Sequence, residues 1–369
     1  MKFSCEKAIL QEAISVASRA VSTKTTISAL ECLLLSATES GVILSGYDLK
    51  TGIQYPVSAD VAEPGAVCLN ARLFGDIIRK LPDDVITVSV DDKLMTTISC
   101  GVTTFNIIAS SADEFPELPE VGRGGALLRM SAKTLKSMIS ETIFAVSENE
   151  NKPIHTGCLF ECTHESLTMV AVDGYRLALR REKLELPPPE ISFVVPGPAL
   201  KEIERILPET DENVSVWPEL KHILFDIGGV IIISRLLEGE FLNYRNTIPK
   251  DHAIEFVCDV KSLIASIERV SLLISEKIKN PVRCTFDENV VKLSCITAIG
   301  KAYDECRLNG RADGLEIGFN SRYLLDALRA VKDDTAVLRL KSGLAPCIIT
   351  PKEGDKYLYL VLPVRLRSN

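Results

Sequence analysis

The chain has 369 residues, of which 46% are hydrophobic and 25% charged, so it can bury sizeable cores and lacks the composition of a disordered chain. Its net charge of −8 argues against a general cationic coat for nucleic acid, but does not exclude a local basic surface. Eleven cysteines, an odd number, and the lack of an apolar run long enough for a bilayer or a secretory signal lead us to expect a soluble cytoplasmic protein with reduced thiols.

The first part of the chain predicts a strand, a helix and a strand hairpin, in an order that occurs twice. A turn at Glu39-Ser40-Gly41 joins two strands, Asn70 is the expected N-cap of the second helix, and Pro82 ends that helix. The predicted strands are 3–5, 32–35, 42–45, 53–57, 66–69, 85–90, 96–99 and 104–108, and the helices begin at Glu6 and span 71–81.

The same order returns twice after Gly122-Arg123-Gly124-Gly125, which its composition marks as a flexible linker. The central part has a helical pattern, a polar loop, two strands and a turn at 172–177, then a strand at 191–195 and a helix at 198–207. The last part has strands at 254–258, 315–319 and 357–363, a turn at 287–289, a helix at 321–331, and Asp259 and Asn320 as N-caps.

One apolar spacing supports a threefold repeat. Steps of three and four residues place side chains on one face of a helix, and copies about 125 residues apart match the size of an ordinary domain. We therefore expect an α+β fold of three repeated domains at 1–122, 123–250 and 251–369, with antiparallel sheets and helices gathered on one sheet face. The three sets are Leu10, Ile14, Ala17 and Val21; Leu135, Ile139, Thr142 and Val146; and Leu263, Ile267, Val270 and Ile274.

Basic residues recur in all six predicted helices of this acidic chain. Any one of them is more simply explained as part of a solvated helix face, and nearby glutamates dilute the pattern, but the repetition favours a surface that faces phosphates. The residues are Lys7, Arg19, Arg72, Arg79, Lys80, Lys133, Lys136, Lys201, Arg205, Lys261, Arg269, Arg322, Arg329 and Lys332.

Motifs for catalysis are weak. The chain has neither a phosphate-binding glycine loop ending in Lys-Ser/Thr nor a dinucleotide fingerprint. Cys158, Cys162 and His164 form a partial metal motif without a second ligand pair, and a thiol in a buried strand is usually inert. A thiol or zinc enzyme built on these three residues is the alternative to a binding protein.

Several motifs, in order along the whole chain, resemble those of one family. They are Met1-Lys2-Phe3, Asp113-Glu114-Phe115-Pro116, Val172-Asp173-Gly174-Tyr175-Arg176-Leu177, Gly239-Glu240-Phe241-Leu242-Asn243-Tyr244, Ser275-Glu276-Lys277, Ile317-Gly318-Phe319-Asn320 with Tyr323, and Leu362-Pro363-Val364-Arg365-Leu366. The chain resembles the bacterial DNA polymerase III β subunit family, the sliding clamps.

The resemblance implies a non-catalytic processivity factor without a cofactor. In that family, three clamp domains per chain place antiparallel sheets outside and helices inside a head-to-tail homodimeric ring around duplex DNA. It implies that Phe105 and Ile107 of one chain meet Leu272 and Leu273 of the other. Ordinary core membership is the alternative for these four residues, and a serious rival for Leu272 and Leu273. A ring that binds peptides but not DNA is a further alternative.

For DNA, the resemblance adds the loop residues Lys24, Asn149 and Lys152, with Lys24 equally well explained as a solvated lysine. The helix residues implied to face DNA are Arg72, Arg79, Lys80, Lys133, Lys136, Lys201, Arg205, Lys261 and Arg322.

The resemblance also implies an apolar groove for short peptides of the replicative polymerase α subunit, the clamp-loader δ subunit and other clamp-binding proteins. His155, Tyr175 and Leu242 differ from the residues common in the family, and Arg367-Ser368-Asn369 extends past its usual end. The implied groove residues are His155, Val172, Gly174, Tyr175, Arg176, Leu177, Leu242, Thr247, Ile278, Tyr323, Leu344, Leu360, Val361, Leu362, Pro363, Val364 and Arg365.

Overall fold

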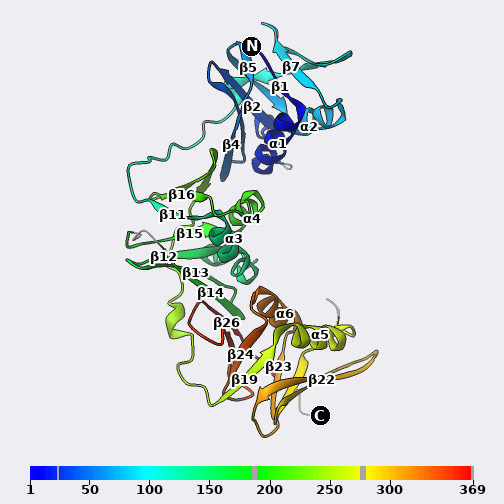
Figure 1. The fold of residues 1–369 in the computed structure, drawn as a ribbon, viewed down its shortest axis with the longest axis vertical. Helices are drawn as coiled ribbons and strands as arrows, with labels where there is room; N and C mark the ends of the chain where they lie inside the picture. The colour runs from blue at the N-terminus through cyan, green and yellow to red at the C-terminus, as the bar shows by residue number, and fades with distance from the viewer. Residues whose placement is uncertain (23–24, 185–188, 275–279, 367–369) are drawn as a thin grey trace. The chain divides into compact units, whose positions relative to one another are not determined.

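The computed structural model describes residues 1–22, 25–184, 189–274 and 280–366. The chain forms two compact units, each made of two chain segments (Figure 1). Unit 1 consists of Met1–Thr134 and Glu202–Leu236, and unit 2 of Leu135–Lys201 and Leu237–Asn369.

Unit 1 contains two sheets. The larger has the strand order β10-β6-β2-β3-β4-β18-β17-β16-β11, and the smaller has the order β5-β1-β7-β8-β9. Their strands are β1 Lys2–Glu6, β2 Cys32–Thr38, β3 Gly41–Tyr47, β4 Thr51–Val57, β5 Asp60–Glu63, β6 Gly65–Asn70, β7 Val85–Val90, β8 Met95–Cys100, β9 Thr103–Ile108, β10 Ser110–Ser111, β11 Leu128–Ser131, β16 Asn213–Pro218, β17 His222–Ile227 and β18 Val230–Arg235.

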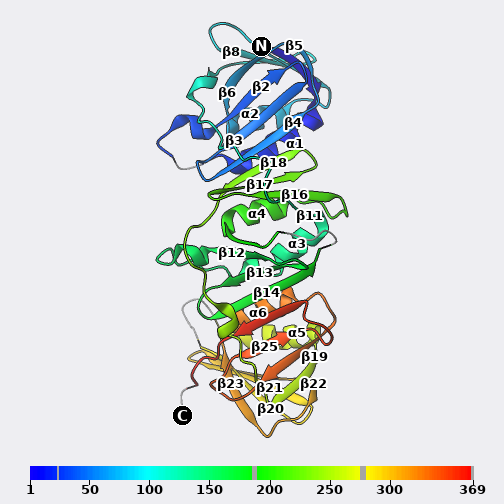
Figure 2. The ribbon, with the colours of Figure 1, turned by 90° about the vertical axis from the view of Figure 1, so that its left-hand side faces the viewer.

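Helices α1 (Lys7–Ala17) and α2 (Ala71–Lys80) pack against each other and against strands of the larger sheet (Figures 1 and 2). Their apolar faces supply Leu10, Phe74 and Ile78, none of which is exposed, to the core of unit 1. The spacing of these side chains along each helix is the reason that both helices lie on the sheet.

Unit 2 is built on one sheet of the order β15-β12-β13-β14-β26-β25-β24-β19-β22-β21-β20-β23. Its strands are β12 Gly157–Cys162, β13 Ser166–Val172, β14 Arg176–Lys183, β15 Ile191–Pro196, β19 Ile254–Asp259, β20 Val282–Asp287, β21 Val290–Thr297, β22 Gly300–Gly310, β23 Leu315–Phe319, β24 Thr335–Leu340, β25 Cys347–Thr350 and β26 Tyr357–Val361.

Helices α5 (Val260–Ser271) and α6 (Ser321–Ala330) lie side by side in unit 2, as α1 and α2 do in unit 1 (Figure 1). Leu263 and Ile267 of α5 and Leu328 of α6 are buried. The remaining helices are α3 Ala132–Ser140, α4 Gly197–Ile206, and the 3₁₀ turns η1 Ser18–Ala20, η2 Ser28–Glu31, η3 Ala112–Glu114, η4 Ile143–Ala145, η5 Pro153–Thr156 and η6 Tyr244–Asn246.

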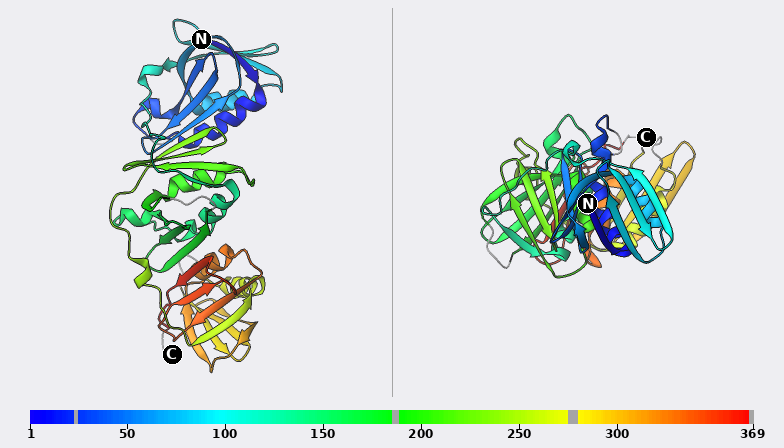
Figure 3. Two further views of the ribbon diagram at one scale, coloured as in Figure 1. Left: turned by 60° about the vertical axis from the view of Figure 1, so that its left-hand side comes forward. Right: turned by 90° about the horizontal axis from the view of Figure 1, so that it is seen from above.

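Both large sheets continue across the expected domain junctions. In unit 1, the blue strand β4 pairs antiparallel with the green strand β18 (Figure 3, left). Ile53 lies opposite Ile232 in this pairing. In unit 2, β14 pairs antiparallel with β26, with Leu177 opposite Leu360. Backbone hydrogen bonds at both positions therefore join segments that are more than 170 residues apart along the chain, as the residue numbers show.

The glycine-rich segment that was expected to be a flexible linker is fastened to unit 1. The Gly122 amide donates to Glu219 Oε1 over 2.7 Å. The Arg123 guanidinium lies over the Trp217 ring at 5.4 Å and pairs with Asp226 at 3.8 Å.

The three predicted N-caps are confirmed, α1 and α4 begin within one residue of the predicted starts, and the predicted ends are partly wrong. The side chains of Asn70, Asp259 and Asn320 each accept a backbone N–H of the helix that follows. Every helix of the threefold repeat ends before its last apolar member. Val21, Thr142, Val146 and Ile274 lie past the ends of α1, α3 and α5, and the Thr142 hydroxyl donates instead to the Met138 carbonyl at 2.8 Å.

Candidate functional site

The turn between β13 and β14 is fixed by its own aspartate. Asp173 Oδ1 accepts the backbone N–H groups of Tyr175 (2.9 Å) and Arg176 (3.1 Å). Gly174 between them has φ 91°, a left-handed conformation that favours glycine, although nothing lies within 4 Å of the position of a Cβ there. The turn therefore presents Tyr175 outward and Arg176 inward.

Arg176 joins this turn to α6. Its side chain is 8% exposed, with Nε 2.9 Å from Asp173 Oδ2 and Nη1 2.6 Å from Asp326 Oδ2. The guanidinium also lies 4.4 Å from the ring centre of Tyr323 and 5.5 Å from that of Phe144. Two carboxylates thus compensate the buried cation, so Arg176 organises the surface rather than offering a free charge.

Aromatic rings continue outward from Arg176. The Tyr175 and Tyr323 rings stack at 6.0 Å with an angle of 24° between their planes. Burial, and secondarily the charge of Asp173, raises the pKa of Tyr323, so its hydroxyl stays neutral at physiological pH. Tyr175 remains 61% exposed, which leaves an aromatic face open to solvent.

The C-terminal segment lies beside this turn. Val361 pairs with Arg176, and the Leu362 amide donates to the Tyr175 carbonyl over 2.9 Å. Farther along, the Val364 amide donates to the Gly318 carbonyl over 2.7 Å, and a Cβ on Gly318 would lie only 2.6 Å from Val364 O. Glycine at 318 is required for this close approach.

The structure thus brings much of the predicted groove together and divides it by exposure. Val172, Leu177, Leu360 and Val361 are buried, the first three in one apolar cluster. The exposed apolar members are Tyr175, Leu242, Leu344, Leu362 and Val364, with Leu344 in the turn between β24 and β25. Pro363 is half-buried, Gly174 and Arg365 are exposed, and Ile278 lies outside the described residues.

His155, Leu242 and Thr247 belong to a neighbouring part of unit 2. The segment 237–250 connects β18 to β19 and is called the linker from here on; it is not the glycine-rich segment at 122–125. It brings Phe241 against His155 with the ring centres 5.5 Å apart. Burial, together with the charge of Lys152, lowers the pKa of His155, so the imidazole is neutral at neutral pH. The Thr247 hydroxyl donates to the Tyr244 carbonyl over 2.7 Å and closes the turn η6.

The residues expected to face DNA are mostly exposed. Arg79 and Lys261 pair with exposed carboxylates at 2.8 and 3.0 Å, whereas exposed Arg205 and Arg322 pair with partly shielded ones at 2.6 and 4.0 Å. Such exposed pairs contribute about 0–1 kcal/mol, so phosphates can compete for these cations. Arg72, Lys80, Lys133, Asn149, Lys152 and Lys201 are also exposed, Lys136 is half-buried with an interaction partner, and Lys24 lies outside the described residues.

The expected interface residues lie in two places, the outermost strand β9 and the turn after α5. Phe105 and Ile107 are in β9, the outermost strand of the smaller sheet of unit 1, and Ile107 packs partly against the core. Leu272, just after α5, is 82% exposed, which rules out core membership for it. Leu273 is half-buried and lies 3.8 Å from where a Cβ on Gly300 of β22 would stand.

The Cys158, Cys162 and His164 motif is not a site in the structure. Both thiols are buried in β12, and burial raises the pKa of each to about 12. His164 is exposed in the following turn and pairs with Glu190 at 3.3 Å. Within the described ranges, no three His, Cys, Asp or Glu side chains are grouped to hold a metal.

Several residues that build this region were not predicted, namely Asp326, Phe144, Glu161, Phe241, Tyr244 and Arg245. The last three lie in or beside a noted motif, but their partners are distant in the sequence.

No helix among the described residues is both long and apolar enough to cross a bilayer.

Three family models together match nearly the whole chain. They describe the N-terminal, central and C-terminal domains of the DNA polymerase III beta subunit and match residues 1–119, 129–243 and 245–365. The chain is 32% identical to the beta sliding clamp of Staphylococcus epidermidis over 99% of both chains, and 33% identical to that of Staphylococcus aureus over 94% of both.

Solved structures agree with these matches. The DNA polymerase sliding clamp of Bacillus subtilis superimposes with a TM-score of 0.96 at 31% identity, over 100% of both chains. The beta subunit from the DNA polymerase of Streptococcus pyogenes does so with a TM-score of 0.94 at 28% identity, over 99% of this chain and 100% of that one. The chain therefore belongs to the family of bacterial DNA polymerase III beta subunits, the beta sliding clamps, with the three-domain clamp fold of that family and its role in DNA replication.

Proposed function

We propose that two copies of the chain form a closed head-to-tail ring that encircles duplex DNA and tethers replication proteins to it. The observation that carries this proposal is a pair of open strand edges in different parts of the chain. β9 is the last strand of its sheet. β22 pairs with β21 from Gly300 to Arg307, but on its other side it pairs with β19 only at Leu308–Gly310.

Both open edges have exposed apolar side chains nearby. Val102, Phe105 and Ile108 lie at β9, whereas Leu272, Ile299 and Tyr303 lie at or near β22. An open edge with apolar neighbours favours pairing with another chain. Because the two edges differ, their pairing is heterologous, and it gives a closed ring when the rotation between copies closes.

Sequence-independent contacts to DNA would come from exposed basic side chains on the helices and loops. Lys and Arg bind phosphates without reading bases, as sliding requires. A ring retains DNA by topology, so each contact can be weak. The net charge of −8 disfavours binding elsewhere on the protein.

The exposed apolar side chains of Tyr175, Leu242, Leu344, Leu362 and Val364 are the proposed lining of the peptide site. An extended peptide with Leu and Phe anchors would bury these side chains while backbone polar groups fix its register. The proposed partners are the replicative polymerase α subunit, the clamp-loader δ subunit and other proteins with clamp-binding motifs.

On this proposal the chain needs no cofactor and catalyses no reaction, but acts in the cytoplasm as a processivity factor. Its three domains, at 1–122, 123–250 and 251–369, would give a ring of six. The burial of both thiols of the Cys158, Cys162 and His164 motif argues against a thiol enzyme.

Retention on circular DNA tests the proposal. After loading onto a nicked plasmid, the protein should stay bound in high salt and leave when a restriction enzyme linearises the circle. Release by salt alone, or retention on linear DNA with free ends, would contradict encirclement. A ring that binds peptides but never circular DNA would be the scaffold alternative.

A further inference from the structure

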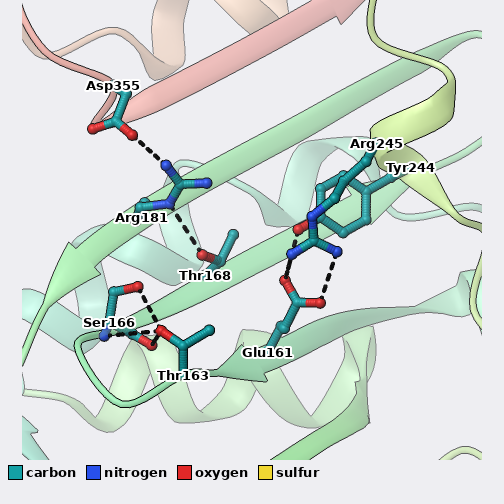
Figure 4. A network of polar contacts seen from close by, with 8 residues as sticks. All are labelled: Glu161, Thr163, Ser166, Thr168, Arg181, Tyr244, Arg245 and Asp355. Atoms are coloured by element: carbon teal, nitrogen blue, oxygen red, sulfur yellow. Dashed lines mark hydrogen bonds and ion pairs between the residues drawn. The ribbon is translucent and has the colours of Figure 1, made fainter. Parts of the chain in front are cut away.

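Glu161 of β12 holds two consecutive residues of the linker (Figure 4). The Tyr244 hydroxyl donates to Glu161 Oε2 over 2.7 Å. Arg245 Nη1 donates to Oε1 over 2.9 Å, and Arg245 Nη2 donates to Oε2. One carboxylate therefore receives three donors, two of them from a guanidinium in a bidentate arrangement.

This contact is partly shielded from water. Tyr244 is 3% exposed, and the Arg245 guanidinium lies 4.7 Å from the centre of its ring. Burial raises the pKa of Glu161, but hydrogen bonds from Arg245 and Tyr244 outweigh burial, so the pKa is lowered overall. The carboxylate is thus charged at neutral pH and pairs with a cation that stays protonated.

Tyr244 connects this contact to the proposed peptide site. Its ring packs in the same buried cluster as Val172, Leu177 and Leu360. The Tyr244 carbonyl accepts the Thr247 hydroxyl, and exposed Leu242 lies two residues before Tyr244. The position of Tyr244 therefore limits where Leu242 and Thr247 can lie.

We propose that Glu161 is a positioning residue for the peptide site. By fixing Tyr244 and Arg245, its carboxylate holds the linker in place before a peptide arrives. A site formed in advance does not have to be ordered during binding, so the affinity is higher. This inference rests on the proposed function of that surface.

A matched control lies on the same sheet. In the register of the sheet, Glu161 of β12 lies opposite Thr168 of β13, and Thr168 lies opposite Arg181 of β14. Arg181 donates to Thr168 at 3.3 Å and also pairs with the exposed Asp355 (Figure 4). Asp355 lies between β25 and β26, so Asp355→Asn removes a surface ion pair that is not made with the linker.

The test measures binding of a fluorescein-labelled pentapeptide with two leucines and a C-terminal phenylalanine, by fluorescence anisotropy. We expect Glu161→Ala to raise its Kd about 5- to 20-fold and Tyr244→Phe about 2- to 5-fold. Glu161→Gln keeps an acceptor and should fall between wild type and Glu161→Ala. Asp355→Asn should stay within about 2-fold of wild type.

Hydrogen exchange provides a second readout. Amides of the linker should exchange faster in Glu161→Ala, while those of β19 and α6 keep their wild-type rates. Unchanged peptide affinity in Glu161→Ala, or equal weakening by Asp355→Asn, would overturn the inference. If Glu161→Ala does not fold, Glu161→Gln and Tyr244→Phe decide by the same comparison. Failure of the wild type to bind the peptide would overturn the peptide site itself, together with the inference that depends on it.

Discussion

At the scale of single residues, Arg176 shows how a buried charge organises an apolar surface. Asp173 and Asp326 bind it from two elements, and Tyr323 covers it. Removing the cation leaves two largely shielded carboxylates without their partner, which costs far more than the loss of an exposed ion pair.

Arg176→Met should therefore lower the free energy of unfolding by about 3 kcal/mol, measured by urea denaturation. Arg322→Met is the matched control, because Arg322 is 72% exposed and lies 4.0 Å from the same Asp326. Its expected effect is within about 0.5 kcal/mol. Equal losses in the two variants would show that burial of Arg176 is not the cause.

His155 should make stability depend on pH. Burial and Lys152 lower its pKa in the folded chain, so the unfolded chain takes up a proton first as the pH falls. The contribution of neutral His155 to the free energy of unfolding is complete above about pH 6.5. It decreases as the pH falls from there toward the pKa of His155 in the folded chain. His155→Phe should lose less stability than wild type between pH 7.5 and 5.5 in urea denaturation. A wild-type response in His155→Phe would refute the assignment.

Residues that act on near neighbours were predictable from the sequence. The caps Asn70, Asp259 and Asn320 hydrogen-bond within three residues, so their roles follow from local spacing. Asp326 and Glu161 act on residues 150 and 83 positions away, and one sequence contains no pattern that joins them.

At the scale of elements, the two open strand edges have the clearest consequence. Exposed β-strand edges are normally protected by charge, proline or a covering segment. Here β9 ends in Ile108, which is 80% exposed, and Leu272 beside the other region is 82% exposed. Both side chains should become buried when two copies associate.

Leu272→Lys should shift the protein from dimer to monomer at micromolar concentration, because burying an unpaired ammonium opposes association. Light scattering would then report the single-chain mass of 40.5 kDa instead of twice that value. Leu220→Lys is the control, since Leu220 is 90% exposed in the turn between β16 and β17, which belongs to neither strand edge, and should leave the dimer intact. A dimeric Leu272→Lys variant would exclude this residue from the interface.

Several strand bounds, and the ends of α2, α4 and α6, were predicted within one residue. β7 and β23 have the predicted bounds, because each is an apolar-rich segment limited by the turn-forming residue types Asp, Gly and Asn. The helical spacing was extended too far through Val21, Val146 and Ile274, since apolar residues that follow a helix can also enter the core from a 3₁₀ turn or a coil.

At the scale of the whole molecule, the proposed function requires an acidic chain to retain an acidic polymer. A double variant that reverses the charge of two exposed lysines, Lys133→Glu with Lys201→Glu, should shorten the time of retention on nicked circular DNA severalfold. Gel filtration after loading measures this retention. Lys93→Glu, in the turn between β7 and β8, should not change it. Light scattering must show a dimer in each case, and normal retention of the double variant would remove these lysines from the DNA surface.

The threefold repeat was recognisable from the sequence, but the two-unit packing was not. Apolar spacing is local, whereas the pairing of β4 with β18 and of β14 with β26 depends on registers between distant segments. The peptide surface depends on the second pairing, because Leu360 and Val361 reach Leu177 and Arg176 through it. The resemblance to a family, rather than periodicity, predicted that these residues act together.

The cysteines have a practical consequence for such experiments. All eleven are free and buried, and burial raises the pKa of Cys284, for example, to about 12. Maleimide reacts with exposed thiolates, so the folded chain should take up dye only at a cysteine introduced on its surface. A fluorophore pair placed across the two strand edges could then follow opening and closing in single molecules, with no native cysteine removed.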